Sequence, residues 1–131
     1  MLNTVVTSLN WQEDLHAIVQ ELKPARWKVF QLLPVPGEND GALAELAVTE
    51  SQFSSFVRTH KDLHPIAETN NAMWESYVML DPVGRFFQDV SKGHTYSRDT
   101  ILEVGVEEAL RQAGGWSRDK FVDRGGRYDL P

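Results

Sequence analysis

The pattern of hydrophobic and polar positions predicts four main strands in the chain. Residues 2–8 are rich in β-branched side chains, and residues 26–33 alternate between apolar and polar side chains, which is typical of strands. Residues 75–80 also alternate, and a turn with proline second and glycine fourth joins them to residues 85–90. These last two segments are expected to form an antiparallel β-hairpin, which spans about 75–90.

Apolar residues at helical spacing predict helices between and after these strands. The first is expected over residues 10–22, where a capping-box pair begins at Asn10, and it ends where a proline follows. A second capping box begins a helix over residues 49–60. Further helices are expected over residues 106–113, which two glycines terminate, and over residues 117–122.

The predicted order of elements is β-α-β-α-β-β-α, which indicates an α/β fold. Residues 34–41 and 64–74 are expected to be irregular, and residues 101–102 to form a short strand. Alternation of strands and helices predicts right-handed crossovers and a parallel sheet. We therefore expect a single α/β domain over residues 1–131, with residues 115–131 as a C-terminal tail.

The first predicted strand lies at the start of the chain, so no earlier element covers its edge. An open edge strand favours association. We expect this edge to pair with another protein segment, either from a partner or from a second copy of the chain.

Composition narrows the classes of function. The chain has 131 residues and no cysteine, which excludes disulfides, thiolate metal sites and an iron–sulfur cluster held by this chain alone. Its net charge of −6 argues against general nucleic-acid binding. The sequence contains no apolar run of about 20 residues and no secretory signal, so we expect a cytoplasmic protein without a membrane partner.

Several polar residues are candidates for a binding site, each with an ordinary structural alternative. Arg26 and Lys28 would share one face of a strand, where they either grip phosphates or are simply solvated. Arg124 and Arg127 flank two glycines, an arrangement that suits phosphate binding but also a solvated terminus.

Other candidates are explained more simply by structure. His60 and His64 have the spacing of a helical metal pair, but a helix end is the favoured interpretation and no metal is expected. Tyr77 is typical of a core aromatic unless a radical or proton role has separate support. The loop at residues 37–39 is too short for a nucleotide fingerprint.

A series of motifs, in register along nearly the whole chain, carries a family resemblance. The segments are 2–6, 26–31, 37–39, 76–81, 85–86, 101–109 and 124–128, with the single residues Asn70 and Met73 between them. Together they resemble the C-terminal half of the proteins of the viperin family. These proteins are radical S-adenosylmethionine nucleotide dehydratases of antiviral defence. The resemblance implies the C-terminal half of a partial (β/α)6 barrel.

The resemblance also implies a reaction. In this family a 4Fe–4S cluster, held by a Cys-x3-Cys-x2-Cys motif in the N-terminal half, cleaves S-adenosylmethionine to a deoxyadenosyl radical. The radical takes a hydrogen from the ribose C4′ of a nucleoside triphosphate, usually CTP. Loss of the 3′-hydroxyl then gives the 3′-deoxy-3′,4′-didehydro nucleotide, which is a chain terminator for viral polymerases.

By position, the resemblance assigns Asn3, Arg26 and Lys28 to the nucleotide, with the two cations on its triphosphate. Tyr77 matches the tyrosine proposed to return a hydrogen to the substrate radical. As a strand residue, it would point inward.

The resemblance assigns two further groups of residues. Arg124, Gly125 and Gly126 match the tail that orders over the bound nucleotide. Glu38 and Asn39 fall at the end of a barrel strand, near the expected position of S-adenosylmethionine.

Two departures from the family pattern shape the functional prediction. The chain has no cysteine, and Met1 stands where the family usually has a phosphate-binding lysine. These departures indicate a fragment that begins partway through the barrel: a piece of a longer protein, a split-gene product or a truncated frame. We expect it to act in the dehydration only with a cluster-bearing N-terminal half; the alternative is a stand-alone, non-catalytic nucleotide-binding or interaction module.

Overall fold

The computed structural model describes residues 1–127, and their contacts divide the chain into two compact units. The first unit comprises residues 1–34 and 38–70. The second comprises residues 35–37 together with the chain from residue 71 onward. No helix among the described residues is both long enough and apolar enough to cross a membrane.

The first unit contains a parallel sheet in the order β1-β2-β3. Its strands are β1 (Leu2–Val6), β2 (Trp27–Gln31) and β3 (Ile66–Glu68). Its helices are α1 (His16–Leu22), α2 (Asp40–Leu46), α3 (Glu50–Thr59) and the 3-10 turn η1 (Lys61–Leu63). The parallel strands and their helical crossovers confirm the predicted α/β character.

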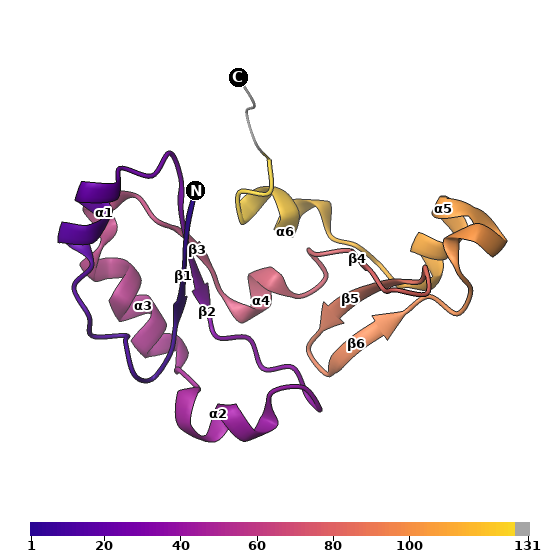
Figure 1. Ribbon diagram of the computed structural model, residues 1–131, viewed down its shortest axis with the longest axis horizontal. Coiled ribbons are helices and arrows are strands. Elements are labelled where there is room, and N and C mark those ends of the chain that lie inside the picture. The colour runs from indigo at the N-terminus through magenta and orange to yellow at the C-terminus, as the bar shows by residue number, and fades with distance from the viewer. Residues whose placement is uncertain (128–131) are drawn as a thin grey trace. The chain divides into compact units, whose positions relative to one another are not determined.

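One face of this sheet forms the core with α1 and α3, which lie beside it in Figure 1. The buried apolar side chains of this core are Val6, Val19, Trp27, Val29, Val48, Phe53 and Phe56. Each large side chain buried in this way contributes about 1.5–3 kcal/mol. Because side chains alternate along a strand, the strand residues that do not face this core point to the opposite face of the sheet.

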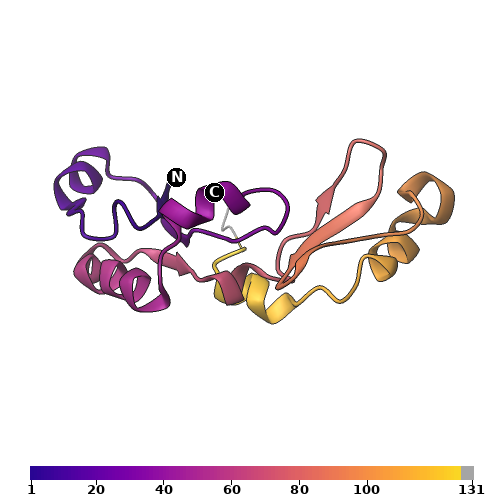
Figure 2. The ribbon, with the colours of Figure 1, turned by 90° about the horizontal axis from the view of Figure 1, so that it is seen from below.

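The second unit contains an antiparallel sheet in the order β4-β5-β6, visible as a meander in Figure 2. Its strands are β4 (Met79–Leu80), β5 (Phe86–Val90) and β6 (Gly93–Tyr96). Its helices are α4 (Asn70–Met73), whose first residue belongs to the first unit, α5 (Ile101–Gln112) and α6 (Arg118–Asp123). The buried Gln88 amide on β5 donates to the Ala113 carbonyl at 3.0 Å, which ties the sheet to the end of α5.

Several local predictions are confirmed. Thr49 and Gln52 form a complete capping box at the start of α3. The amide of Gly84 donates to the Asp81 carbonyl at 3.0 Å, which closes the predicted turn between β4 and β5. Ser117 caps α6 by accepting a hydrogen bond from the Lys120 amide. The fold over residues 1–127 is mixed α/β, and these residues form no closed barrel.

The predicted start of the first helix is wrong. The helix begins at His16 rather than after Asn10. The Asn10 side-chain oxygen accepts from the Thr7 amide at 2.7 Å, so this residue closes a turn instead of capping a helix. A short polar side chain that bonds to nearby backbone offers the chain this alternative to a helix.

Regular structure also occurs where none was predicted. Helix α2 follows the loop that begins at Pro34, and β3 and α4 lie within residues 64–74. Residues 101–102 begin α5 instead of forming a strand, because Thr100 and Glu103 make a capping box there. These elements are short or lack alternation, which leaves little periodic signal to detect.

The expectation that Tyr77 lies on a strand is also wrong. Of residues 75–80, only Met79–Leu80 form a strand, β4. Glu75 has a φ of 61°, and the Ser76 hydroxyl donates to the Ala72 carbonyl at 2.7 Å. This backbone geometry turns the chain after α4, so Tyr77 lies in an irregular segment before β4.

Candidate functional site

The face of the parallel sheet opposite the apolar core carries a cluster of polar side chains. Asn3 on β1 pairs in register with Lys28 on β2, and Phe30 pairs with Glu68 on β3. Paired residues share a face, so Asn3, Lys28 and Glu68 lie on the same side of the sheet. The sequence predicted Asn3 and Lys28 as nucleotide ligands, and the structure brings them together.

Lys28 and Glu68 form a buried ion pair. The Lys28 ammonium lies 2.5 Å from the Glu68 carboxylate, and the side chains are 3% and 0% exposed. Removing two charges from water is costly, and the close contact between them offsets part of that cost. The pair runs from β2 toward the carboxyl end of β3, the end of a parallel sheet where ligands usually bind.

Arg26 has a different setting from Lys28, although the sequence placed both on one strand face. Arg26 lies just before β2, and its carbonyl accepts from the Leu2 amide at 2.8 Å. It lines an open cavity of about 520 Å³ together with Lys23, His64 and apolar side chains of the first unit. Lys23 and Arg26 make that cavity cationic.

In the second unit, Arg124 stacks on Tyr77. The Arg124 guanidinium carbon lies 3.6 Å from the centre of the Tyr77 ring, well within the range of a cation–π contact. The same guanidinium donates to the Ser76 carbonyl at 2.8 Å, and Arg124 is only 5% exposed. Two residues that the resemblance assigned to separate roles are therefore in direct contact.

The glycines after Arg124 let the chain pass close to α6. The amide of Gly126 donates to the Phe121 carbonyl at 2.8 Å, and a Cβ on Gly126 would approach that oxygen to 2.4 Å. Gly125 has a φ of 69°, which favours glycine. The predicted tail over residues 115–131 is therefore partly helical up to Asp123, and its last residues, 128–131, lie outside the described part of the chain.

Glu38 and Asn39 lie directly before the first residue of α2. Glu38 is exposed, whereas the Asn39 amide nitrogen donates to the Leu33 carbonyl at 2.9 Å. Asn39 also precedes the first residue of the helix. These contacts account for Asn39 as a loop residue, and its predicted cofactor role stays a prediction.

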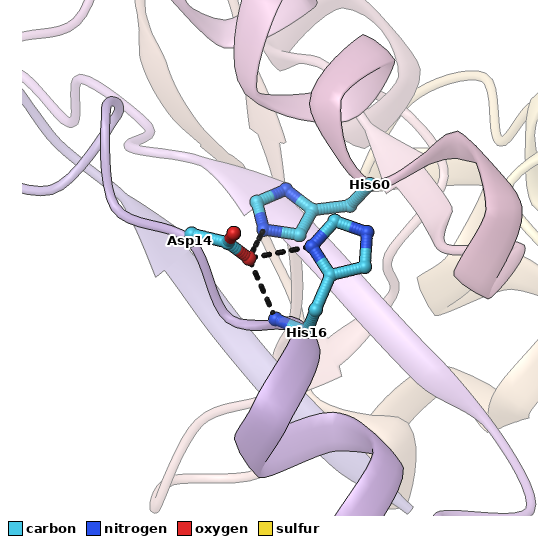
Figure 3. A group of neighbouring side chains, drawn as sticks. All are labelled: Asp14, His16 and His60. Atoms are coloured by element: carbon cyan, nitrogen blue, oxygen red, sulfur yellow. Dashed lines mark hydrogen bonds and ion pairs between the residues drawn. The ribbon is translucent and has the colours of Figure 1, made fainter.

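A third cluster was not found from the sequence, because its members lie far apart in the chain. Figure 3 shows the rings of His16 and His60 beside the carboxylate of Asp14. His16 Nδ1 lies 2.5 Å from Asp14, and His16 Nε2 lies 2.9 Å from Asp62. The His60 ring stacks on the His16 ring, with centroids 5.0 Å apart.

The contacts of this cluster favour a charged imidazole over a metal site. In His60, Nε2 accepts from the Leu15 amide at 2.9 Å and Nδ1 donates to the Phe56 carbonyl at 2.8 Å, so neither nitrogen offers a lone pair to a metal. His16 lies between two carboxylates. Its hydrogen bonds to Asp62 and to Asp14 raise its pKa, and the pKa of each aspartate is lowered in turn.

Individual known proteins are similar to this chain over nearly its whole length. No family model matches the chain. An S-adenosylmethionine-dependent nucleotide dehydratase of Flammeovirga pacifica is 49% identical over 128 residues, which cover 97% of this chain and 43% of that protein. A protein of the same name from Lacinutrix mariniflava is 43% identical, over 98% of this chain and 27% of its own length.

The similarity extends to vertebrates. The S-adenosylmethionine-dependent nucleotide dehydratase RSAD2 of Oncorhynchus mykiss is 38% identical, over 97% of this chain and 38% of its own length. The chain therefore spans less than half the length of each of these relatives. Over nearly all of its residues, this chain is a homologue of part of the S-adenosylmethionine-dependent nucleotide dehydratases, which confirms the resemblance found in its sequence.

Proposed function

We propose that this chain is the nucleotide-binding C-terminal portion of a viperin-like enzyme. The enzyme would convert a nucleoside triphosphate, most simply CTP, to its 3′-deoxy-3′,4′-didehydro form in antiviral defence. The observation that carries the proposal is the buried ammonium of Lys28 beside Asn3, on the face of the parallel sheet opposite the core. In a partial (β/α)6 barrel that face would be the interior, where the substrate is held.

The residues of this chain do not fit an iron–sulfur cluster, because the sequence has no cysteine to bind one. Formation of the radical from S-adenosylmethionine is therefore assigned to a cluster-bearing N-terminal half. This chain would bind and orient the nucleotide. Lys28 would contact the phosphates, with Asn3 beside it on the nucleotide. Arg26, which lies just before β2, is assigned to the phosphates by the resemblance alone.

Tyr77 would serve as the hydrogen donor to the substrate radical. The stacked guanidinium of Arg124 fixes the plane of its ring, and the hydrogen bond from Arg124 to Ser76 fixes the adjoining backbone. Arg124 would then act on the reaction through Tyr77 as well as through the nucleotide. Gly125 and Gly126 would follow it over the substrate.

The missing cysteines support a second candidate, a stand-alone nucleotide-binding module without catalysis. Calorimetry with CTP, UTP and GTP on the isolated chain separates the two. Micromolar binding that needs no partner favours the module. Binding that appears only with a cluster-bearing half favours the enzyme.

The test of the proposed reaction is reconstitution. The chain is mixed with a cluster-loaded N-terminal half of a homologue, S-adenosylmethionine, a reductant and CTP, and the didehydro nucleotide is measured by mass spectrometry. Lys28→Gln should abolish the product, whereas Lys61→Gln, which alters an exposed lysine of the same unit, should not. Absence of product from a cluster-loaded complex of the unaltered chain would contradict the proposal.

A further inference from the structure

Glu68 is the residue whose carboxylate pairs with the Lys28 ammonium. It lies at the end of β3, a strand that the sequence pattern did not reveal, and its side chain is fully buried. Its carboxylate lies 2.5 Å from the Lys28 ammonium, although the two residues are 40 positions apart in the chain. The Lys28 ammonium that the nucleotide is expected to bind is therefore already paired with an anion of the protein.

A carboxylate and a phosphate cannot share this ammonium without cost. Both groups are anionic, and in a buried setting their repulsion is screened far less than in water. Lys28 and Glu68 together are neutral, so a phosphate added beside the intact pair gains little from Lys28. The phosphate gains the full attraction only if it takes the place of the Glu68 carboxylate.

We propose that Glu68 is an internal counter-ion, which holds the Lys28 ammonium in place on the sheet and yields that position to a phosphate of the bound nucleotide. Glu68 is thus a positioning residue for the phosphate site. This inference rests on the proposed function, because it concerns the same site. It adds that affinity for the triphosphate is set by competition between Glu68 and the ligand.

The competition has a consequence for the unliganded chain. Glu68 keeps Lys28 charged and oriented while the site is empty, because an unpaired buried ammonium is strongly disfavoured. Removing the carboxylate leaves Lys28 without its anion until a phosphate arrives. A purely structural carboxylate would lower stability when removed, but it would not make phosphate binding tighter.

The test is calorimetry of inorganic triphosphate and of CTP with the full chain and with Glu68→Gln, which removes the charge and keeps the shape. We expect Glu68→Gln to be less stable alone, to bind triphosphate at least tenfold more tightly, and to gain a larger rise in Tm from it. Glu45→Gln, at an exposed position of the same unit, is the matched control and should bind as the unaltered chain does.

The outcomes separate the two proposals. If the unaltered chain binds triphosphate and Glu68→Gln binds it equally or more weakly, the counter-ion role is wrong while the phosphate site stands. If neither protein binds triphosphate or CTP, the phosphate site itself is wrong and the counter-ion role falls with it. If Glu68→Gln does not fold, Glu68→Asp decides: its shorter carboxylate loosens the pair, so binding at least threefold tighter is expected and unchanged binding refutes the role.

Discussion

Replacing Arg124 with alanine should destabilise the second unit by about 2–4 kcal/mol. The change removes a cation–π contact with Tyr77 at 3.6 Å and a weaker one with Phe121 at 5.0 Å. A desolvated cation–π contact contributes up to about 2 kcal/mol. The substitution also removes the hydrogen bond from the Arg124 guanidinium to the buried Ser76 carbonyl. Hydrogen bonds from charged donors contribute about 1.5–3 kcal/mol.

Urea unfolding followed by NMR measures this change directly, because amide signals of α6 and β5 report on the second unit alone. Arg124→Lys keeps the charge but loses the planar stacking group, so it should recover less than half of the lost stability. Arg118→Ala, which removes the exposed arginine at the start of α6, is the matched control and should shift stability by less than about 0.5 kcal/mol.

A loss below about 0.5 kcal/mol in Arg124→Ala would refute this account of the contact, since it would equal an ordinary surface substitution. Full rescue by Arg124→Lys would refute the stacking component in particular. In that case only the charge of residue 124 would matter, and its role in fixing the Tyr77 ring would be withdrawn.

Three further predictions concern other parts of the chain. Asp62 and Asp14 raise the pKa of His16, so the stability that protonated His16 contributes is complete below about pH 6.5 and is lost as the pH rises through its pKa in the folded chain. The difference in Tm between the unaltered chain and His16→Ala should therefore shrink from pH 6 to pH 9, and a constant difference would contradict the ion pair. Gly126→Ala should weaken α6, measured as faster amide hydrogen exchange at Phe121 and its neighbours, because the added Cβ meets the Phe121 carbonyl at 2.4 Å; unchanged exchange would count against this geometry. In sedimentation at micromolar concentration the isolated chain should associate through the outer edge of β1, and a strict monomer would contradict that edge pairing.

The sequence predicted best the features that depend on neighbouring residues. The capping box at Thr49 and the turn that ends at Gly84 were both found, because each is a local bonding pattern with its own residue signature. The core face of β2 was also predicted, since alternation alone places Trp27 and Val29 together. Strand β3 was missed because three residues are too few to show a period.

The candidate site was predicted only as far as its residues carry family motifs. The pairing of Lys28 with Glu68 joins residues 40 positions apart, and the bridge from His16 to Asp62 joins residues 46 apart. No spacing rule connects such pairs, because the path of the backbone brings them together. The contact of Arg124 with Tyr77 was hidden for the same reason, and also because Tyr77 was expected on a strand.

Lys28 and Arg124 show why an assignment by sequence position leaves the energetics of a site open. Both were assigned to an anionic ligand, yet each is buried against a partner within its own unit: Lys28 on the Glu68 carboxylate, Arg124 on the Tyr77 ring and the Ser76 carbonyl. A nucleotide that bound to either cation would have to replace these contacts with its own, so the net gain would be smaller than the attraction between a phosphate and a solvated cation suggests. The two exchanges also differ in kind. A phosphate that displaces Glu68 removes a competing negative charge, whereas one that draws Arg124 away from Tyr77 would release the ring that the proposed hydrogen transfer needs held. Within the proposed function, we therefore expect the affinity for phosphate to depend more on Lys28 than on Arg124.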